Sequence, residues 1–273
     1  MGPVEDAVAK IQRGKQVVVD LWGKNIGDDG AKALAAAIAK SVRLQNINLS
    51  NNQISDVGAT ALAAAIEKSK SLQVIDLDDN RIRDDGATAL AAAVETSTSL
   101  KDIVLSDNHI TGAGAKALAV AIEKSTSLLL IALDDNQITD EGATALAVAV
   151  GKSLSIQTFG LGNNQITDVG AAAIAAAIEK SASLQDINLN WNEITDVGAA
   201  VLAAAAHKSA SLQGFSVSGE FMTDEGKRDL EWAWGRHAKS VAASAALSGS
   251  RFLSAAMAIR RESLWTTMAS TPR

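Results

Sequence analysis

The sequence repeats itself every 28 residues, and this period restricts the possible folds more than any other feature of the chain. Large aliphatic residues recur at this spacing, at Leu44, Leu72, Leu100, Leu128, Ile156, Leu184 and Leu212. Asparagines recur at the same spacing, at Asn52, Asn80, Asn108, Asn136, Asn164 and Asn192. Such a period is typical of solenoids, in which each unit buries its apolar face against the next.

Each unit combines a strand pattern with a helix pattern. Residues 72–82 read L-x-x-I-x-L-x-x-N-x-I, which predicts a short strand, and residues 84–94 are rich in the strong helix formers Ala and Leu. Parallel strands lie about 4.8 Å apart, whereas packed helices need about 8 to 10 Å. The stack must therefore curve. We predict an α/β solenoid of about eight 28-residue units, a partial horseshoe with parallel strands on its concave face and helices on its convex face.

The unit resembles the leucine-rich repeats of the ribonuclease-inhibitor-like subclass, which are similar to those of NOD-like receptors and Ran GTPase-activating protein. The resemblance covers roughly residues 17–226. It implies that each repeated Asn turns its amide inward and hydrogen-bonds the backbone of the turn, forming a structural ladder. Lys24 and Glu220 replace the Asn in the two end units, as expected for terminal repeats that face water on one side.

The chain divides into three segments by its pattern. We expect an N-terminal cap at 1–16, the leucine-rich-repeat array at 17–226, and a helical basic C-terminal cap or tail at 227–273. Trp232 and Trp234 are expected to cover the open end of the core. The alternatives for this last segment are a loosely ordered tail and an amphipathic helix on a membrane surface.

Charge and cysteine content narrow the classes of partner and compartment. The net charge is −6, and residues 227–273 carry +5, which leaves −11 on the remainder. An acidic array repels nucleic acid and anionic membranes, so we expect neither as the partner of the array. The chain contains no cysteine, which fits a reducing compartment. We expect a cytoplasmic monomer, with the nucleus as the alternative location.

Each helix is expected to begin at an Asp that precedes a Gly by two residues, because Asp is a favoured N-cap. These residues are Asp28, Asp56, Asp84, Asp140, Asp168, Asp196 and Asp224. One unit has Gly112 at this position, so we expect its own helix to begin less firmly.

Motifs for catalysis or cofactor binding are absent from the sequence. It contains no G-x-S-x-G, no H-E-x-x-H and no phosphate-binding loop, and its three histidines fall in three different settings. The acidic run at residues 76–80 starts like a calcium loop, but Arg81 and Ala87 replace the Gly and Glu that an EF-hand needs. The sequence does not exclude a cation that is bound by carboxylates from several strands. We predict no enzyme, no cofactor and no metal site.

The strand positions that point away from the core vary from unit to unit. Six of them are Asp and none is Lys or Arg, although Asp is a poor strand former. Apolar residues and two tryptophans near the rim accompany these carboxylates. The candidate partner-binding residues are Trp22, Val74, Asp76, Asp78, Asp102, Val104, Leu130, Asp134, Asp186 and Trp191.

These residues suit a basic protein partner, through electrostatic steering and a few apolar anchors. We therefore expect a non-catalytic protein-interaction module, and a merely solvated acidic face is the alternative interpretation of the same residues. Two further alternatives follow from the resemblance: a regulator of a small GTPase similar to Ran GTPase-activating protein, and the sensor fragment of a protein of the NOD-like-receptor type.

Overall fold

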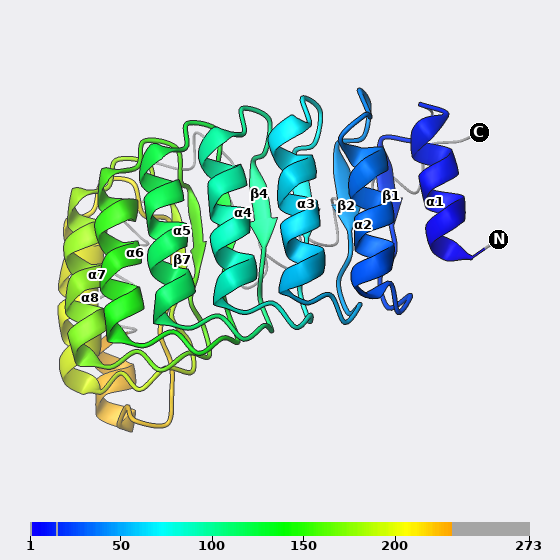
Figure 1. Cartoon of the computed structure of the whole chain (residues 1–273). Coiled ribbons are helices and arrows are strands. Elements are labelled where there is room, and N and C mark those ends of the chain that lie inside the picture. Colours follow the sequence, from blue (N-terminus) through cyan, green and yellow to red (C-terminus); the bar gives the residue numbers. More distant parts are fainter. Residues whose placement is uncertain (1, 15, 231–273) are drawn as a thin grey trace, which may run out of the picture.

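The computed structural model describes residues 2–14 and 16–230, which form a curved stack of strand–helix repeats (Figure 1). The helices are α1 (Pro3–Gln12), α2 (Gly27–Ile38), α3 (Asp56–Lys68), α4 (Asp84–Thr96), α5 (Gly112–Lys124), α6 (Asp140–Lys152), α7 (Asp168–Lys180) and α8 (Asp196–Lys208). The strands are β1 (Val18–Asp20), β2 (Asn46–Asn48), β3 (Val74–Asp76), β4 (Asp102–Val104), β5 (Leu130–Ala132), β6 (Thr158–Gly160), β7 (Asp186–Asn188) and β8 (Gly214–Ser216). A further helical segment occupies residues 224–230.

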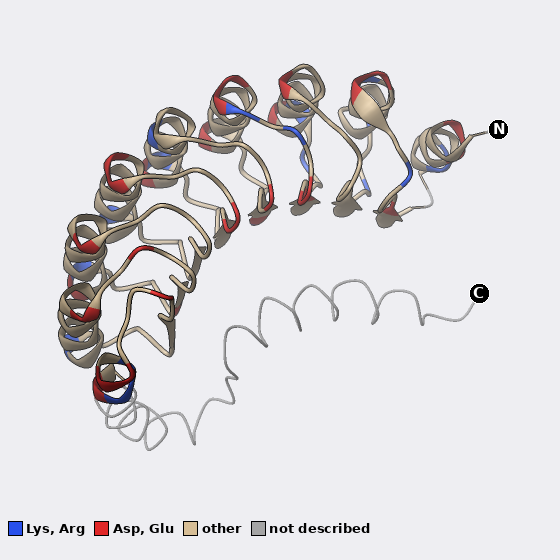
Figure 2. Ribbon diagram, turned by 90° about the horizontal axis from the view of Figure 1, so that it is seen from below, with Lys and Arg blue, Asp and Glu red and all other residues tan. Residues whose placement is uncertain are grey.

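The strands form one parallel sheet in the order β1 to β8. Neighbouring strands pair in a register of one repeat, so that Ile47 lies opposite Ile75 and Ile75 lies opposite Ile103. The sheet lines the inside of the arc and the helices form its outside (Figure 2). The predicted α/β solenoid is thus confirmed.

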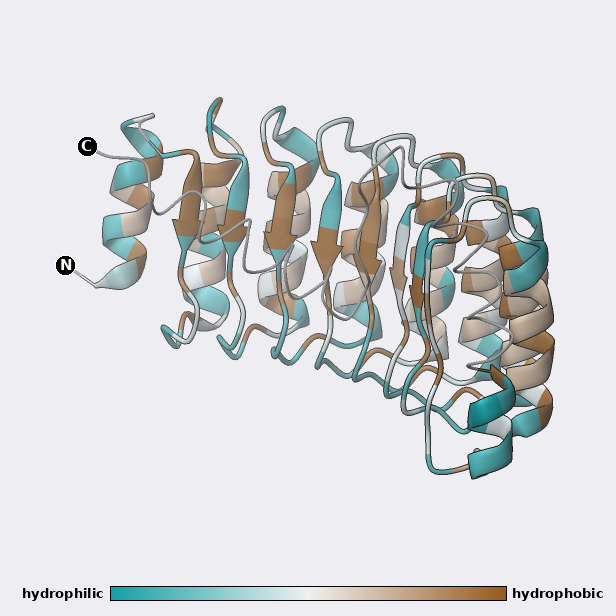
Figure 3. Ribbon diagram, turned by 180° about the vertical axis from the view of Figure 1, so that it is seen from behind, coloured by the Kyte–Doolittle hydropathy of each residue, from teal (hydrophilic) through white to brown (hydrophobic). Residues whose placement is uncertain are grey.

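The core lies between the sheet and the helices and continues through the stack. Leu72, Ile75 and Leu77 of one unit are at most 1% exposed, as is Leu90 from the helix behind them. Hydrophobic residues follow the strands and line the helices, whereas hydrophilic residues gather at the turns (Figure 3). Alanines such as Ala87 let adjacent helices approach closely, because they fill little of the space between backbones.

The repeated asparagines form a ladder of hydrogen bonds between adjacent turns. Asn108 Nδ2 donates to the carbonyl oxygens of Leu77 at 3.0 Å and Ser106 at 2.9 Å. Its Oδ1 accepts from the N–H of Ile82 at 2.9 Å. Asn136 repeats this pattern one unit later, with Leu105 and Ile110 in the matching roles. Each amide therefore joins its own turn to the preceding repeat, which satisfies buried backbone groups that no strand or helix pairs.

The prediction that Asp is the N-cap of its own helix is wrong. In α3, α7 and α8 the N-cap is the Ser or Thr before the Asp, for example Ser55 before Asp56, and the Asp is the first helical residue. The Asp caps the next helix along the stack instead. Asp84 Oδ1 accepts from the N–H groups of Thr111 at 2.8 Å and Gly114 at 2.9 Å, and its Oδ2 accepts from Thr111 Oγ1 at 2.7 Å. Asp28, Asp140 and Asp168 make the same three contacts with the helix that follows each of them.

Gly112 consequently weakens a different helix from the one predicted. Helix α5, which contains Gly112, is capped by Thr111 and by Asp84 of the preceding repeat. Helix α6 is the one that follows Gly112, and its N-cap residue Thr139 makes no side-chain cap hydrogen bond. A carboxylate at position 112 would face α6, so the missing cap belongs to α6.

The two ends of the array are closed differently. At the first end, α1 packs Ala7 and Ile11 against α2, and both residues are buried. At the last end, Met222 and Leu230 are buried. The two tryptophans expected to cover this end, Trp232 and Trp234, lie outside the described residues. Within residues 2–14 and 16–230, each helix is too short or too polar to cross a membrane.

Candidate functional site

The concave face, defined here as the side chains of β1–β8 that point away from the helices, is more closely packed than the sequence predicted. Val74 and Leu130 are 7% and 6% exposed, and Asp76 and Asp102 are 2% and 6% exposed. These four candidate partner-binding residues are therefore buried rather than exposed on the face.

Register accounts for much of this packing. The side chain of Asp76 lies between its counterparts in β2 and β4, Asn48 and Val104. Because the strands are about 4.8 Å apart, a short side chain between two neighbours leaves little surface for solvent. Asp20 has one strand neighbour, at the edge of the sheet, and is exposed. Val104 and Asp186 remain partly exposed.

An acidic rim borders the concave face where β3, β4 and β5 run into their turns. It consists of Asp78, Asp79, Asp107, Asp134 and Asp135. Asp79, Asp107 and Asp135 are exposed and occupy equivalent positions in successive repeats, and Figure 2 shows acidic residues on turns that border the strands. Burial raises the pKa of Asp107, and the charges of Asp79 and Asp135 raise it further, although His109 partly offsets them. The rim therefore concentrates negative charge that repels itself.

Asp79, Asp107 and Asp135 were not selected as candidate site residues from the sequence, because the backbone conformation of the turn by itself explains an Asp at each position. Asp79, Asp107 and Asp135 have φ values of 51°, 49° and 53°, in the left-handed region. Asn51 and Asn163 occupy the same turn position with the same conformation. Asn and Asp tolerate this conformation better than most residues, so either type fits the turn. The signal that identifies a site is the uninterrupted succession of charge in three neighbouring repeats.

Asp134 reaches across a whole repeat. Its Oδ1 accepts from Asn188 Nδ2 at 2.7 Å and from the N–H of Gly162 at 2.8 Å. Gly162 makes this possible, because a Cβ there would lie 2.7 Å from Asn188 Nδ2 and 2.8 Å from Asp134 Oδ1. Burial raises the pKa of Asp134 to about 6, against these hydrogen bonds, which favour the charged form. The ionised Asp134 side chain therefore lowers the free energy of unfolding near neutral pH.

Trp191 is strained and exposed at the same time. It occupies the turn position that holds Asp or Asn in the repeats immediately before it, with φ of 60°, and its side chain is 62% exposed. A bulky residue with positive φ is an outlier, because its Cβ crowds the following carbonyl oxygen. Trp22 is 57% exposed on the first repeat. Both tryptophans therefore border the concave face, one on the first repeat and one on the seventh.

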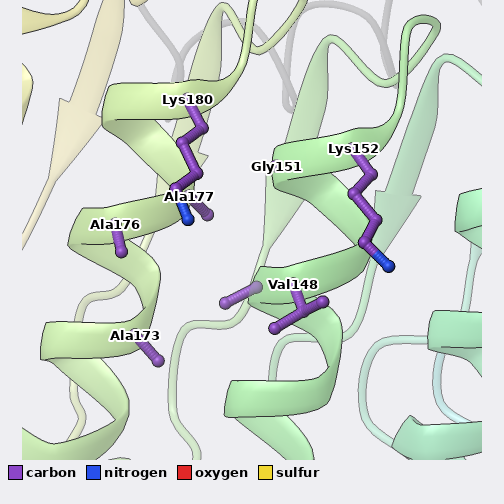
Figure 4. Close-up of a pocket in the computed structure, with 8 residues that line it drawn as sticks. Val148, Gly151, Lys152, Ala173, Ala176, Ala177 and Lys180 are labelled. Atoms are coloured by element: carbon purple, nitrogen blue, oxygen red, sulfur yellow. The ribbon is translucent and has the colours of Figure 1, made fainter.

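The convex face carries a weaker candidate, a shallow groove between α6 and α7 (Figure 4). Ion pairs join helices elsewhere on this side, from Lys124 to Glu95 and from Lys152 to Glu123. Gly151 stands where α3, α4, α5 and α7 have Glu, which opens the groove beside Lys180. The lining is otherwise mostly Ala and Val, which gives this groove little to select one partner over another.

A metal-binding role finds no support among the described residues. Within 2–14 and 16–230, His, Asp and Glu side chains do not gather in groups of three that suit a metal ion. Asp79, Asp107 and Asp135 of the acidic rim instead lie in a row, one per repeat.

Comparison with protein-family models matches the description "Leucine Rich repeat" at residues 44–63, 68–91, 96–119, 124–147, 152–175 and 180–203, about half of the chain. A search of curated proteins gave no significant match.

Solved structures similar to this chain include "Leiomodin-1 Actin-Binding Site 2 (ABS2)", with 16% identity and a TM-score of 0.49, covering 54% of this chain and 87% of that chain. Another is a tropomodulin C-terminal domain from Caenorhabditis elegans, with 19% identity and a TM-score of 0.45, covering 55% of this chain and 92% of that chain.

Proposed function

Because the chain belongs to the leucine-rich-repeat family, we propose that it is a non-catalytic module that binds a basic protein along the concave face and the acidic rim. The observation that carries this proposal is the row of exposed carboxylates at equivalent positions of three successive repeats, Asp79, Asp107 and Asp135. We also assign the repeats to the ribonuclease-inhibitor-like subclass, which the 28-residue unit with one helix per repeat supports.

Electrostatics supports a basic partner. The three rim carboxylates repel one another, as the raised pKa of Asp107 reflects, with burial as the larger cause. A cationic partner that lies across the rim relieves this repulsion. Binding is therefore favoured both by long-range attraction and by the reduced repulsion between the carboxylates. Asp134 contributes a further charge, and its pKa of about 6 ties part of the attraction to pH values above 6.

Aromatic residues supply the apolar part of the surface. Trp191 and Trp22 are each more than half exposed. Exposed tryptophans beside charged residues are typical anchors of protein interfaces, where they exclude water from the polar contacts. The strained backbone of Trp191 supports a role beyond folding, since the matching residue of the preceding repeat, Asn163, adopts the same conformation with a side chain that tolerates it.

Site-specific photo-crosslinking tests the proposal. A photoreactive phenylalanine analogue replaces Ser106, which is partly exposed at the end of β4 between Asp78 and Asp134. The matched control replaces Val120, which is 49% exposed on α5 of the same repeat. After irradiation in cell extract, crosslinked proteins are identified by mass spectrometry and their sequence charge is compared.

We expect the Ser106 probe to capture proteins that the Val120 probe does not, and that carry a basic segment at the crosslink. Substitution of Asp79, Asp107 and Asp135 by Asn should remove this capture while leaving the fold intact, because the three side chains are exposed. Capture through Val120 alone would move the binding site to the convex face. Capture through Ser106 that survives the triple substitution would remove the acidic rim from the site.

A further inference from the structure

The concave face carries negative charge that is partly buried. Its outward strand positions include Asp76, Asp102 and Asp186, and none of these positions is Lys or Arg. Asp76 and Asp102 are 2% and 6% exposed. A carboxylate this buried is stabilised when a cation lies against it, because the attraction offsets part of the lost hydration. The face therefore favours a cationic group close to the strands as well as along the rim.

The chain contains a segment with the matching charge. Residues 231–273 include six basic residues and two Glu, a net charge of +4, so the preceding 230 residues carry −10. The basic residues are Arg236, Lys239, Arg251, Arg260, Arg261 and Arg273. Apolar residues stand between them, including Leu253, Met257 and Leu264. The segment thus combines cationic groups with apolar side chains, which are the two features that the concave face and its exposed tryptophans call for.

Length and position allow this segment to reach the face. The described array ends at Leu230, beside the last repeat, and 43 residues follow it. Eight strands about 4.8 Å apart span about 34 Å. The segment would span about 65 Å as a helix and about 140 Å when extended. Either conformation is long enough to turn round the open end of the array and run along all eight strands.

We propose that residues 231–273 bind the concave face of their own chain, with their arginines against its carboxylates. This proposal rests on the proposed function in one respect, since both use the same acidic surface. It adds that the surface has an internal occupant, which an external basic protein must displace. Because the segment is tethered, its effective concentration at the face is of millimolar order, so a weak contact is enough to compete.

Spin-label distance measurements on the full chain test this proposal without any partner. The natural sequence has no cysteine, so labels on Ser106→Cys and Ser254→Cys report a single pair. β4 lies at the middle of the sheet, about 20 Å from β8. We expect a narrow distance distribution below about 30 Å for this pair. A second pair, on Val120→Cys and Ser254→Cys, should give longer distances, because Val120 lies on the convex helix α5.

Charge reversal separates the electrostatic contact from chance proximity. Substitution of Arg251, Arg260 and Arg261 by Glu should abolish the narrow distribution. The matched control reverses Lys40, Lys68 and Lys180, which are exposed and lie on or just after convex helices. It changes the net charge equally and should leave the distribution unchanged.

Two results would overturn the proposal. Broad distances in the parent chain would show that the face does not hold the segment. Loss of the narrow distribution on dilution with unlabelled chain would assign the contact to a second copy. Loss of the narrow distribution only when phosphatidylserine vesicles are added would support the internal contact and show that a membrane surface competes for the segment. The two proposals fail in different ways: broad spin-label distances with external capture through Ser106 would leave only the proposed function standing, and a narrow distribution without external capture would leave only the internal contact standing.

Discussion

Substitution of Gly112 by Asp should stabilise the array by restoring the one inter-repeat cap that the described helices α3 to α8 lack. In α5, α7 and α8 the preceding repeat provides a carboxylate that accepts from two N–H groups and one hydroxyl. A Cβ at position 112 would lie 3.5 Å from both Gly142 N and Thr139 Oγ1, an ordinary contact distance. The backbone of Gly112 is not in the left-handed region, so a side chain is tolerated.

The magnitude follows from two contributions. An N-terminal cap is worth about 0.5 to 2 kcal/mol, and removal of a helical Gly adds up to about 1 kcal/mol by itself. Gly112→Ala isolates the second contribution, because it supplies the Cβ without the carboxylate. We expect the unfolding free energy in urea to rise in the order parent, Gly112→Ala, Gly112→Asp, with about 1 kcal/mol between the two variants.

The pH dependence gives an independent check. Burial opposes ionisation of Asp84, but hydrogen bonds from Thr111 and Gly114 hold the pKa of this carboxyl below its usual value. A lowered folded-state pKa contributes stability above the unfolded value of about 3.9, and this stability is lost as the pH falls through the folded value. The advantage of Gly112→Asp over Gly112→Ala should therefore be complete at pH 7 and shrink below about pH 4. Equal stability of the two variants at pH 7 would refute the inter-repeat cap.

Three further substitutions test the ladder, the buried carboxylate and the strained tryptophan. Asn136→Ala should lower the unfolding free energy by about 1 to 3 kcal/mol, whereas the exposed neighbour Gln137→Ala should change it little; similar urea midpoints would contradict the ladder. Asp134→Asn should raise the unfolding free energy by about 1 to 2 kcal/mol above pH 6 and leave it unchanged below about pH 4, because the raised pKa disfavours the charged form in the folded state. A difference in unfolding free energy that stays constant across this pH range would be inconsistent with that cause. Trp191→Asn should raise stability by about 1 kcal/mol through relief of backbone strain yet weaken partner binding, and unchanged binding would remove Trp191 from the site.

The fold was predictable from the sequence because the same local pattern recurs in every unit. Leu72, Asn80 and their counterparts fix the strand, the turn and the direction of burial, and stacking similar units leaves one arrangement that buries them all. The partners of the repeated Asp were not predictable in this way. The periodicity shows that Asp84 recurs near a helix start, but contacts between residues 27 and 30 positions apart depend on how adjacent turns are stacked.

The candidate site was predicted less well than the fold, for a related reason. The register correctly placed Asp76 and Val74 on the concave side, but their exposure depends on the packing of neighbouring strands. Asp107 was overlooked because its turn position also suits Asn, so conformational preference masked the charge pattern. The face of the sheet toward which a side chain points follows from its position in its own strand, whereas the exposure of that side chain depends on residues in the strands on either side.

The association rate of a protein captured through Ser106 tests the central claim most directly. It is measured at about 0.05 M and about 0.5 M salt, between which the screening length falls from about 14 Å to about 4 Å. We predict that the rate for the parent chain falls at least about tenfold. The variant with Asn at positions 79, 107 and 135 should bind slowly at low salt and respond weakly to salt, whereas neutralisation of the exposed acids Asp29, Glu67 and Asp85 should leave the rate near that of the parent. A parent rate that ignores salt, or equal slowing by both sets of substitutions, would contradict a binding site on the acidic rim.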